Sequence, residues 1–183
     1  MSIPTLLTWA RIGLIPVFMV CFYLPFQWTN EAAAIVFLLA AITDWLDGYL
    51  ARKWDETSRF GAFLDPVADK LMVAAALVML VQKYPTLVLV LPAVVIIGRE
   101  ITVSALREWM AEIGERASVA VSTMGKVKTM VQMFSLTLLI YGDPLFGFPT
   151  FEIGVVLLYL AVVLTMWSML VYMKAAWPAL KDE

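Results

Sequence analysis

Four aspartates lie in two closely spaced pairs in the first half of the chain. Asp44 and Asp47 are three residues apart, and Asp65 and Asp69 are four residues apart. In a helix, both spacings place the two side chains on the same face. Carboxylate oxygens are ligands for Mg²⁺, Mn²⁺ or Ca²⁺, and four carboxylates suit two ions that together hold a phosphate or diphosphate. The spacing therefore predicts a two-metal site for phosphate chemistry.

Two glycines and an arginine accompany the aspartates. Gly48 and Gly61 allow the backbone to approach a ligand closely, and Arg52 can bind phosphate oxygens in a forked geometry. We therefore expect a nucleotide to bind here. The alternative is that the aspartates only cap helices or pair with nearby basic side chains. That alternative would explain a single pair of aspartates. The combined spacing of four aspartates, two glycines and one arginine disfavours it.

Histidine is absent from the sequence, and the single cysteine, Cys21, lies in an apolar stretch. These counts exclude histidine-activated nucleophiles, histidine-ligated metals, internal disulfides and cysteine-rich zinc sites. Acid-base chemistry and metal binding must therefore use Asp and Glu, with Lys and Arg as counter-charges.

A second group of charged residues suits an acceptor that carries a phosphate. Arg99 and Arg107 are eight residues apart, which places them on roughly the same helix face, and Lys126 opens the following predicted helix. Arginine gives forked contacts to phosphate, and lysine adds a point charge. We expect Arg99, Arg107 and Lys126 to bind the acceptor phosphate, with Glu100 and Glu108 holding the arginines through ion pairs.

Other basic residues near these groups admit a second interpretation. Arg116 and Lys128 are favoured as anchors that attract lipid headgroups on the cytoplasmic side, although Lys128 remains a candidate for the acceptor site. Thr8 and Arg11 are further candidates, because the first predicted helix can bring them to the same cavity.

The composition indicates a polytopic membrane protein that is all-α. Of the 183 residues, 62% are hydrophobic and 15% are charged, with a mean hydropathy of +0.87, whereas soluble domains are about 45–50% apolar and about 25% charged. A spanning helix needs about 20 mostly apolar residues. We expect one domain, 1–183, with six transmembrane helices at roughly 5–26, 31–53, 61–82, 86–110, 124–142 and 151–175.

The basic residues predict how these helices are oriented. With the N-terminus in the cytoplasm, 12 of the 13 basic residues fall on the cytoplasmic side, and only Lys83 falls on the other. This bias follows the positive-inside rule and places both termini in the cytoplasm. The ranges 44–70 and 99–128 hold 19 of the 28 charges, so we expect one site at the cytoplasmic face.

The segment from Asp44 to Asp69 contains the pattern D-x₂-D-G-x₂-A-R-x₈-G-x₃-D-x₃-D. It resembles, at every position, the signature of the CDP-alcohol phosphotransferases, membrane enzymes that transfer a phosphatidyl group from a CDP-linked lipid to an alcohol and release CMP. The resemblance implies a homodimer of six-helix subunits. It also implies two divalent cations, Mg²⁺ or Mn²⁺, held by Asp44, Asp47 and Asp65. Asp69 would lie near the second ion and act as the general base, and Gly48, Arg52 and Gly61 would bind the CDP-lipid.

Three further segments, 3–16, 99–111 and 125–129, resemble the bacterial members of this family that use glycerol 3-phosphate. This resemblance implies transfer from CDP-diacylglycerol to glycerol 3-phosphate, giving phosphatidylglycerol phosphate and CMP. The expected location is the bacterial cytoplasmic (inner) membrane, with the active site facing the cytoplasm. The expected partners are these two substrates, membrane lipids and a second copy of the chain, without nucleic acid.

Three alternatives remain. A related transferase could use another acceptor, such as inositol phosphate, serine or phosphatidylglycerol, because the aspartates do not discriminate among acceptors. Intramembrane prenyltransferases also use aspartates and Mg²⁺, but their motifs lack the coupled glycines and arginine. A divalent-cation channel or transporter would need its carboxylates on a path through the membrane, whereas these are predicted to lie at one face.

Overall fold

The computed structural model describes residues 3–54, 59–113 and 123–181, and it is all-helical there, apart from an isolated bridge between Leu145 and Phe148. The described part contains six α-helices, as the apolar segments predict. They are α1 (Ile3–Tyr23), α2 (Thr29–Trp54), α3 (Arg59–Lys83), α4 (Leu87–Glu112), α5 (Thr123–Tyr141) and α6 (Thr150–Lys181).

Two helix ends differ from those predicted. α1 ends at Tyr23 rather than near residue 26, because Pro25 disfavours a helical conformation at the residue before it. α6 continues to Lys181, six residues beyond the predicted end at 175. The prediction ended with the apolar segment, but helix formation does not require apolar residues, and Ala175 and Ala176 are strong helix formers.

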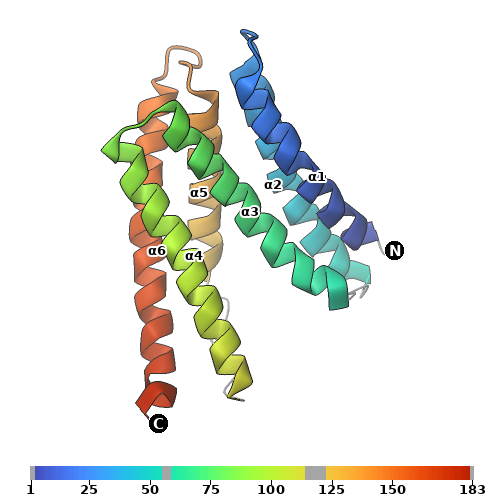
Figure 1. Cartoon of the computed structure of the whole chain (residues 1–183), viewed down its shortest axis with the longest axis vertical. Helices are drawn as coiled ribbons and strands as arrows, with labels where there is room; N and C mark the ends of the chain where they lie inside the picture. The colour runs from blue at the N-terminus through green and yellow to red at the C-terminus, as the bar shows by residue number, and fades with distance from the viewer. Residues whose placement is uncertain (1–2, 55–58, 114–122, 182–183) are drawn as a thin grey trace.

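The helices form two groups, which are linked by α3 and by direct packing of α2 on α5 (Figure 1). α1 packs on α2, α5 packs on α6, and α4 packs on α6, while α3 contacts members of both groups. The α1–α2, α3–α4 and α5–α6 connections lie at one end of the molecule, and both termini lie toward the other end. The two groups diverge toward the end with the termini, which also carries the two charged segments.

Much of the outer surface is apolar. Val78, Val94 and Val156 are more than half exposed on three different helices, whereas soluble proteins rarely expose large contiguous apolar surfaces. Within the described residues, three helical segments are long and apolar enough to cross a membrane, and α5 contains a shorter apolar segment. The three are Leu6–Tyr23, Leu87–Glu112 and Thr150–Lys174. These features are those of a membrane protein.

A polar network joins three elements at the end opposite the termini. Lys83 Nζ donates a hydrogen bond to Asn30 Oδ1 (2.6 Å), and Asn30 Nδ2 donates to Asp143 Oδ2 (3.1 Å). Burial lowers the pKa of Lys83, and the charge of Asp143 partly opposes that shift. We call this the Lys83–Asn30–Asp143 network. It connects the start of α2, the end of α3 and the α5–α6 connection.

Candidate active site

The acidic part of the site lies where α1, α2 and α3 meet. Arg11 of α1 is only 1% exposed and forms an ion pair with Asp44 of α2, with 2.7 Å between Nη1 and Oδ1. Thr8, one turn earlier on α1, donates a hydrogen bond to the Asp65 carboxylate of α3. Thr8 and Arg11 therefore lie directly against two of the four aspartates.

Asp69 is close enough to both the acidic and the basic parts of the site to be influenced by their charges. It is one helical turn after Asp65 on α3, and it interacts electrostatically with Asp44 and Arg11. It also interacts with Glu100 of α4 and Lys128 of α5. The two charged segments of the sequence thus come together around one carboxylate.

For four of the predicted site residues, the structure describes the helix but not the position of the side chain. Asp47, Gly48 and Arg52 belong to α2, and Lys126 belongs to the first turn of α5, but the surroundings of these four residues are not part of the description. Gly61 is buried near the start of α3.

Carboxylate oxygens are the donor set expected for Mg²⁺ or Mn²⁺, and Asp44, Asp65 and Asp69 supply such oxygens from two adjacent helices. Within the described residues, no three acidic side chains lie close enough together to hold an ion. Asp44 is bound by Arg11, and Asp65 accepts a hydrogen bond from Thr8. Ions at this site would therefore compete with Arg11 for Asp44, and a complete ligand set would need Asp47.

The basic part of the site is built around a single carboxylate oxygen. Arg99 Nη1 (2.8 Å) and Lys128 Nζ (2.9 Å) both donate to Glu100 Oε1. Arg99 Nη2 also donates to Ser168 Oγ of α6 at 2.9 Å. We call Arg99, Glu100, Lys128 and Ser168 the basic cluster. The side chains of Arg99 and Lys128 are only 10% and 8% exposed, so the cluster joins α4, α5 and α6 in a largely buried position.

Arg107, the other described arginine of the predicted acceptor site, lies apart from the basic cluster. It is exposed, donates a hydrogen bond to the hydroxyl of Tyr172, and has its guanidinium 4.9 Å from the Tyr172 ring centre. Sequence reasoning missed Ser168 and Tyr172. Their spacing of four residues, within a mostly apolar helix, is the signal that could have identified them.

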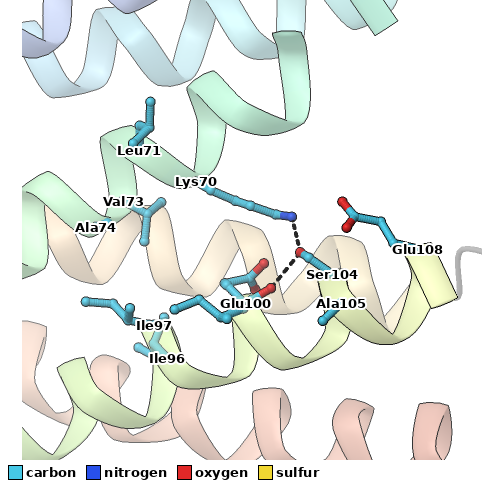
Figure 2. Close-up of a pocket in the computed structure, with 11 residues that line it drawn as sticks. Lys70, Leu71, Val73, Ala74, Ile96, Ile97, Glu100, Ser104, Ala105 and Glu108 are labelled. Carbon is cyan, nitrogen blue, oxygen red and sulfur yellow. Dashed lines mark hydrogen bonds between the residues drawn. The ribbon is translucent and has the colours of Figure 1, made fainter. Parts of the chain in front are cut away.

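A groove of about 440 Å³ runs between α3 and α4 beside the charged residues (Figure 2). At its polar end, Lys70 donates to Ser104 Oγ, and Ser104 in turn donates to the Glu100 backbone carbonyl at 2.6 Å. Val73 and Ile96 line the apolar part. Since Lys70 follows Asp69 and Glu100 belongs to the basic cluster, the groove connects the site with the apolar outer surface.

Known proteins resemble this chain over almost its whole length. The sequence model of the CDP-alcohol phosphatidyltransferase family matches residues 1–167. A curated protein of Yersinia pestis (strain Pestoides F) is 56% identical over 183 residues, covering 100% of this chain and 98% of the relative. A protein of Pectobacterium atrosepticum is 56% identical over 175 residues, covering 96% of this chain and 94% of the relative. A protein of Shigella flexneri serotype 5b is 52% identical over 182 residues, covering 100% and 98%. All three are named CDP-diacylglycerol–glycerol-3-phosphate 3-phosphatidyltransferase. The chain belongs to the CDP-alcohol phosphatidyltransferase family.

Proposed function

We propose that this protein transfers the phosphatidyl group of CDP-diacylglycerol to glycerol 3-phosphate, giving phosphatidylglycerol phosphate and CMP. The observation that carries the proposal is that the acidic and basic groups lie next to each other: Lys70, the neighbour of Asp69, donates to Ser104, one turn after Glu100 of the basic cluster. The name shared by the full-length relatives supports the same reaction. A site of this kind can hold a diphosphate next to a phosphorylated alcohol.

The aspartates are assigned to the donor side of the reaction. Asp44, Asp47, Asp65 and Asp69 would hold two divalent cations, Mg²⁺ or Mn²⁺, which supply neutralisation of the diphosphate charge. Gly48, Arg52 and Gly61 would contact the CDP group. Thr8 and Arg11 would fix the orientation of Asp65 and Asp44, since they contact these carboxylates directly.

Asp69 is assigned as the general base. It accepts the proton of the 1-hydroxyl of glycerol 3-phosphate while that oxygen attacks the phosphorus attached to diacylglycerol. The new P–O bond forms as the bond to CMP breaks, so CMP leaves with both bonding electrons. The chain contributes mainly by positioning the two substrates and by providing charges aimed at the phosphates.

The basic cluster is assigned to the acceptor. Arg99 and Lys128 converge on one Glu100 oxygen, so the two cations are already held close enough to share an anion. A phosphate could replace the Glu100 carboxylate between them and make forked contacts with Arg99. Lys126 and Arg107 would add positive charge toward the cytoplasmic end.

The membrane arrangement follows from the same assignment. All six helices would cross the bacterial inner membrane, with both termini and the active site at the cytoplasmic face, and two subunits would form a homodimer. The diacylglycerol chains would enter sideways from the bilayer. The groove between α3 and α4 supports such an entry, because its polar end lies at the site and Leu71 and Ile101 line it with exposed apolar side chains.

The test is an acceptor panel. The purified full-length protein is incubated with CDP-diacylglycerol, Mg²⁺ and one of five acceptors, namely glycerol 3-phosphate, glycerol, inositol phosphate, serine or phosphatidylglycerol. CMP release and the mass of the lipid product are measured. We expect release with glycerol 3-phosphate and a product with the mass of phosphatidylglycerol phosphate. Release confined to any other acceptor would refute the choice of glycerol 3-phosphate.

A further inference from the structure

Three buried polar atoms near the basic cluster lack a hydrogen-bond partner within the described residues. They are Gln132 Oε1 of α5, Thr165 Oγ1 of α6 and Arg99 Nε of α4. The exposed fractions of Gln132 and Thr165 are 5% and 0%. An unsatisfied buried polar group costs about 1–3 kcal/mol, and lipid chains offer no alternative partner. These atoms therefore require a partner that the described chain does not supply.

Helical spacing places Gln132 and Thr165 on the faces that meet the basic cluster. Gln132 follows Lys128 by four residues on α5, so it lies one turn deeper on the face that reaches Glu100. Thr165 precedes Ser168 by three residues on α6, and Ser168 accepts a hydrogen bond from Arg99. Both side chains thus lie one helical turn from a residue of the basic cluster, Lys128 on α5 and Ser168 on α6.

Neighbouring polar side chains on α5 show that the protein can satisfy such groups internally. Ser135 is fully buried and donates to the Gly154 backbone carbonyl at 2.7 Å. Thr137 donates to the Met133 carbonyl of its own helix at 2.9 Å. Unsatisfied atoms are therefore not a general property of the buried polar side chains of α5, although one also occurs in the described residues at Glu31 Oε2, at the other end of the bundle.

We propose that Gln132 and Thr165 bind the 2-hydroxyl group of glycerol 3-phosphate and thereby select a polyol phosphate as acceptor. The inference rests on the proposed function. Gln132 Oε1 can only accept a hydrogen bond, Thr165 Oγ1 can donate or accept, and Arg99 Nε can only donate. A hydroxyl that donates to Gln132 and accepts from Thr165, next to a phosphate that accepts from Arg99, satisfies all three atoms at once.

The experiment compares two acceptors that differ by this hydroxyl. The full-length enzyme is assayed with CDP-diacylglycerol and either glycerol 3-phosphate or 3-hydroxypropyl phosphate, which keeps the attacking hydroxyl and the phosphate. We expect Gln132→Leu and Thr165→Val each to reduce the preference for glycerol 3-phosphate, measured as the ratio of the two kcat/KM values, by about tenfold. The KM for CDP-diacylglycerol should be unchanged. Thr137→Val and Ser135→Ala are the controls and should keep the wild-type preference.

Gln132→Met, which retains an unbranched chain and lacks the amide, provides a second test, so the result does not depend on one variant folding. An unchanged preference in active Gln132 and Thr165 variants would overturn the inference. An equal loss toward both acceptors would also overturn it, because that result reports a structural role. Failure of the wild-type enzyme to use glycerol 3-phosphate would instead refute the proposed function, so the two failures are distinguishable.

Discussion

Replacing Glu100 with glutamine tests whether the shared carboxylate stabilises the basic cluster. Glu100→Gln keeps the size of the side chain and removes its charge. Arg99 and Lys128 are then left without their shared counter-charge, and their two positive charges repel each other. We expect the variant to be less stable than the wild-type protein because both cations are largely buried.

The geometry gives the size of the effect. The nitrogen–oxygen distances of 2.8 and 2.9 Å place the charge centres roughly 4 Å apart, and each such pair contributes about 4 kcal/mol at an effective dielectric constant near 20. The glutamate is itself 25% exposed, and the cost of removing the charges from water offsets much of this attraction. Removing one partner of a largely buried pair leaves a net loss of about 3 kcal/mol.

The assay is a double-mutant cycle on the free energy of unfolding, measured in mixed micelles. The cycle contains the wild type, Glu100→Gln, Lys128→Met and the double variant. Since Lys128→Met removes one of the two cations, the double variant should lose at least about 1 kcal/mol less than the sum of the single losses. Glu152→Gln, at an exposed position near the start of α6, is the control and should change stability by about 0.5 kcal/mol or less.

Two results would refute this reasoning. A Glu100→Gln variant within about 0.5 kcal/mol of wild type would show that the carboxylate does not stabilise the cluster. Strict additivity in the cycle would show that Glu100 and Lys128 act independently despite their 2.9 Å contact.

Three further predictions concern chemistry and packing. Asp69→Asn should abolish CMP release but retain much of the Mn²⁺ binding, measured by electron paramagnetic resonance; near-normal turnover would exclude Asp69 as the base. Chelation by EDTA should stop CMP release, and Mg²⁺ or Mn²⁺ should restore it; full activity in EDTA would contradict metal use. Gly154→Ala should destabilise the protein by about 1–3 kcal/mol, because the new methyl group would lie 2.8 Å from Leu139 Cγ. Gly98→Ala has nothing within 4 Å and should not lower the unfolding temperature; an equal loss in both variants would refute the packing argument.

The sequence predicted the helices well because the apolar segments, long or short, are bounded by charges, prolines or glycines. It also predicted that the two charged segments share one end of the bundle, since alternating helices return them to the same side. Hydropathy did not predict the end of α6. The helix continues beyond the apolar segment, through less apolar residues, to Lys181.

The pairing of individual side chains was harder to predict. Surface anchoring was the favoured interpretation of Lys128, but this residue is 6% exposed and donates to Glu100. Arg11 and Thr8 were candidates for the acceptor site, and their contacts with Asp44 and Asp65 were not predicted. These contacts depend on the rotation and crossing of helices far apart in sequence, which local spacing does not encode.

The Lys83–Asn30–Asp143 network would serve as the pivot for any change of helix tilt, because it fixes three elements to one another at one end. It joins elements at one end, and the helix groups diverge toward the other (Figure 1). α3 has 25 residues and is therefore about 37 Å long. A rotation of about 5° at the pivot moves the far end of such a helix by about 3 Å. A small change of helix tilt would therefore alter the spacing of the charged residues by about the diameter of one atom, while the contacts near the network would barely change.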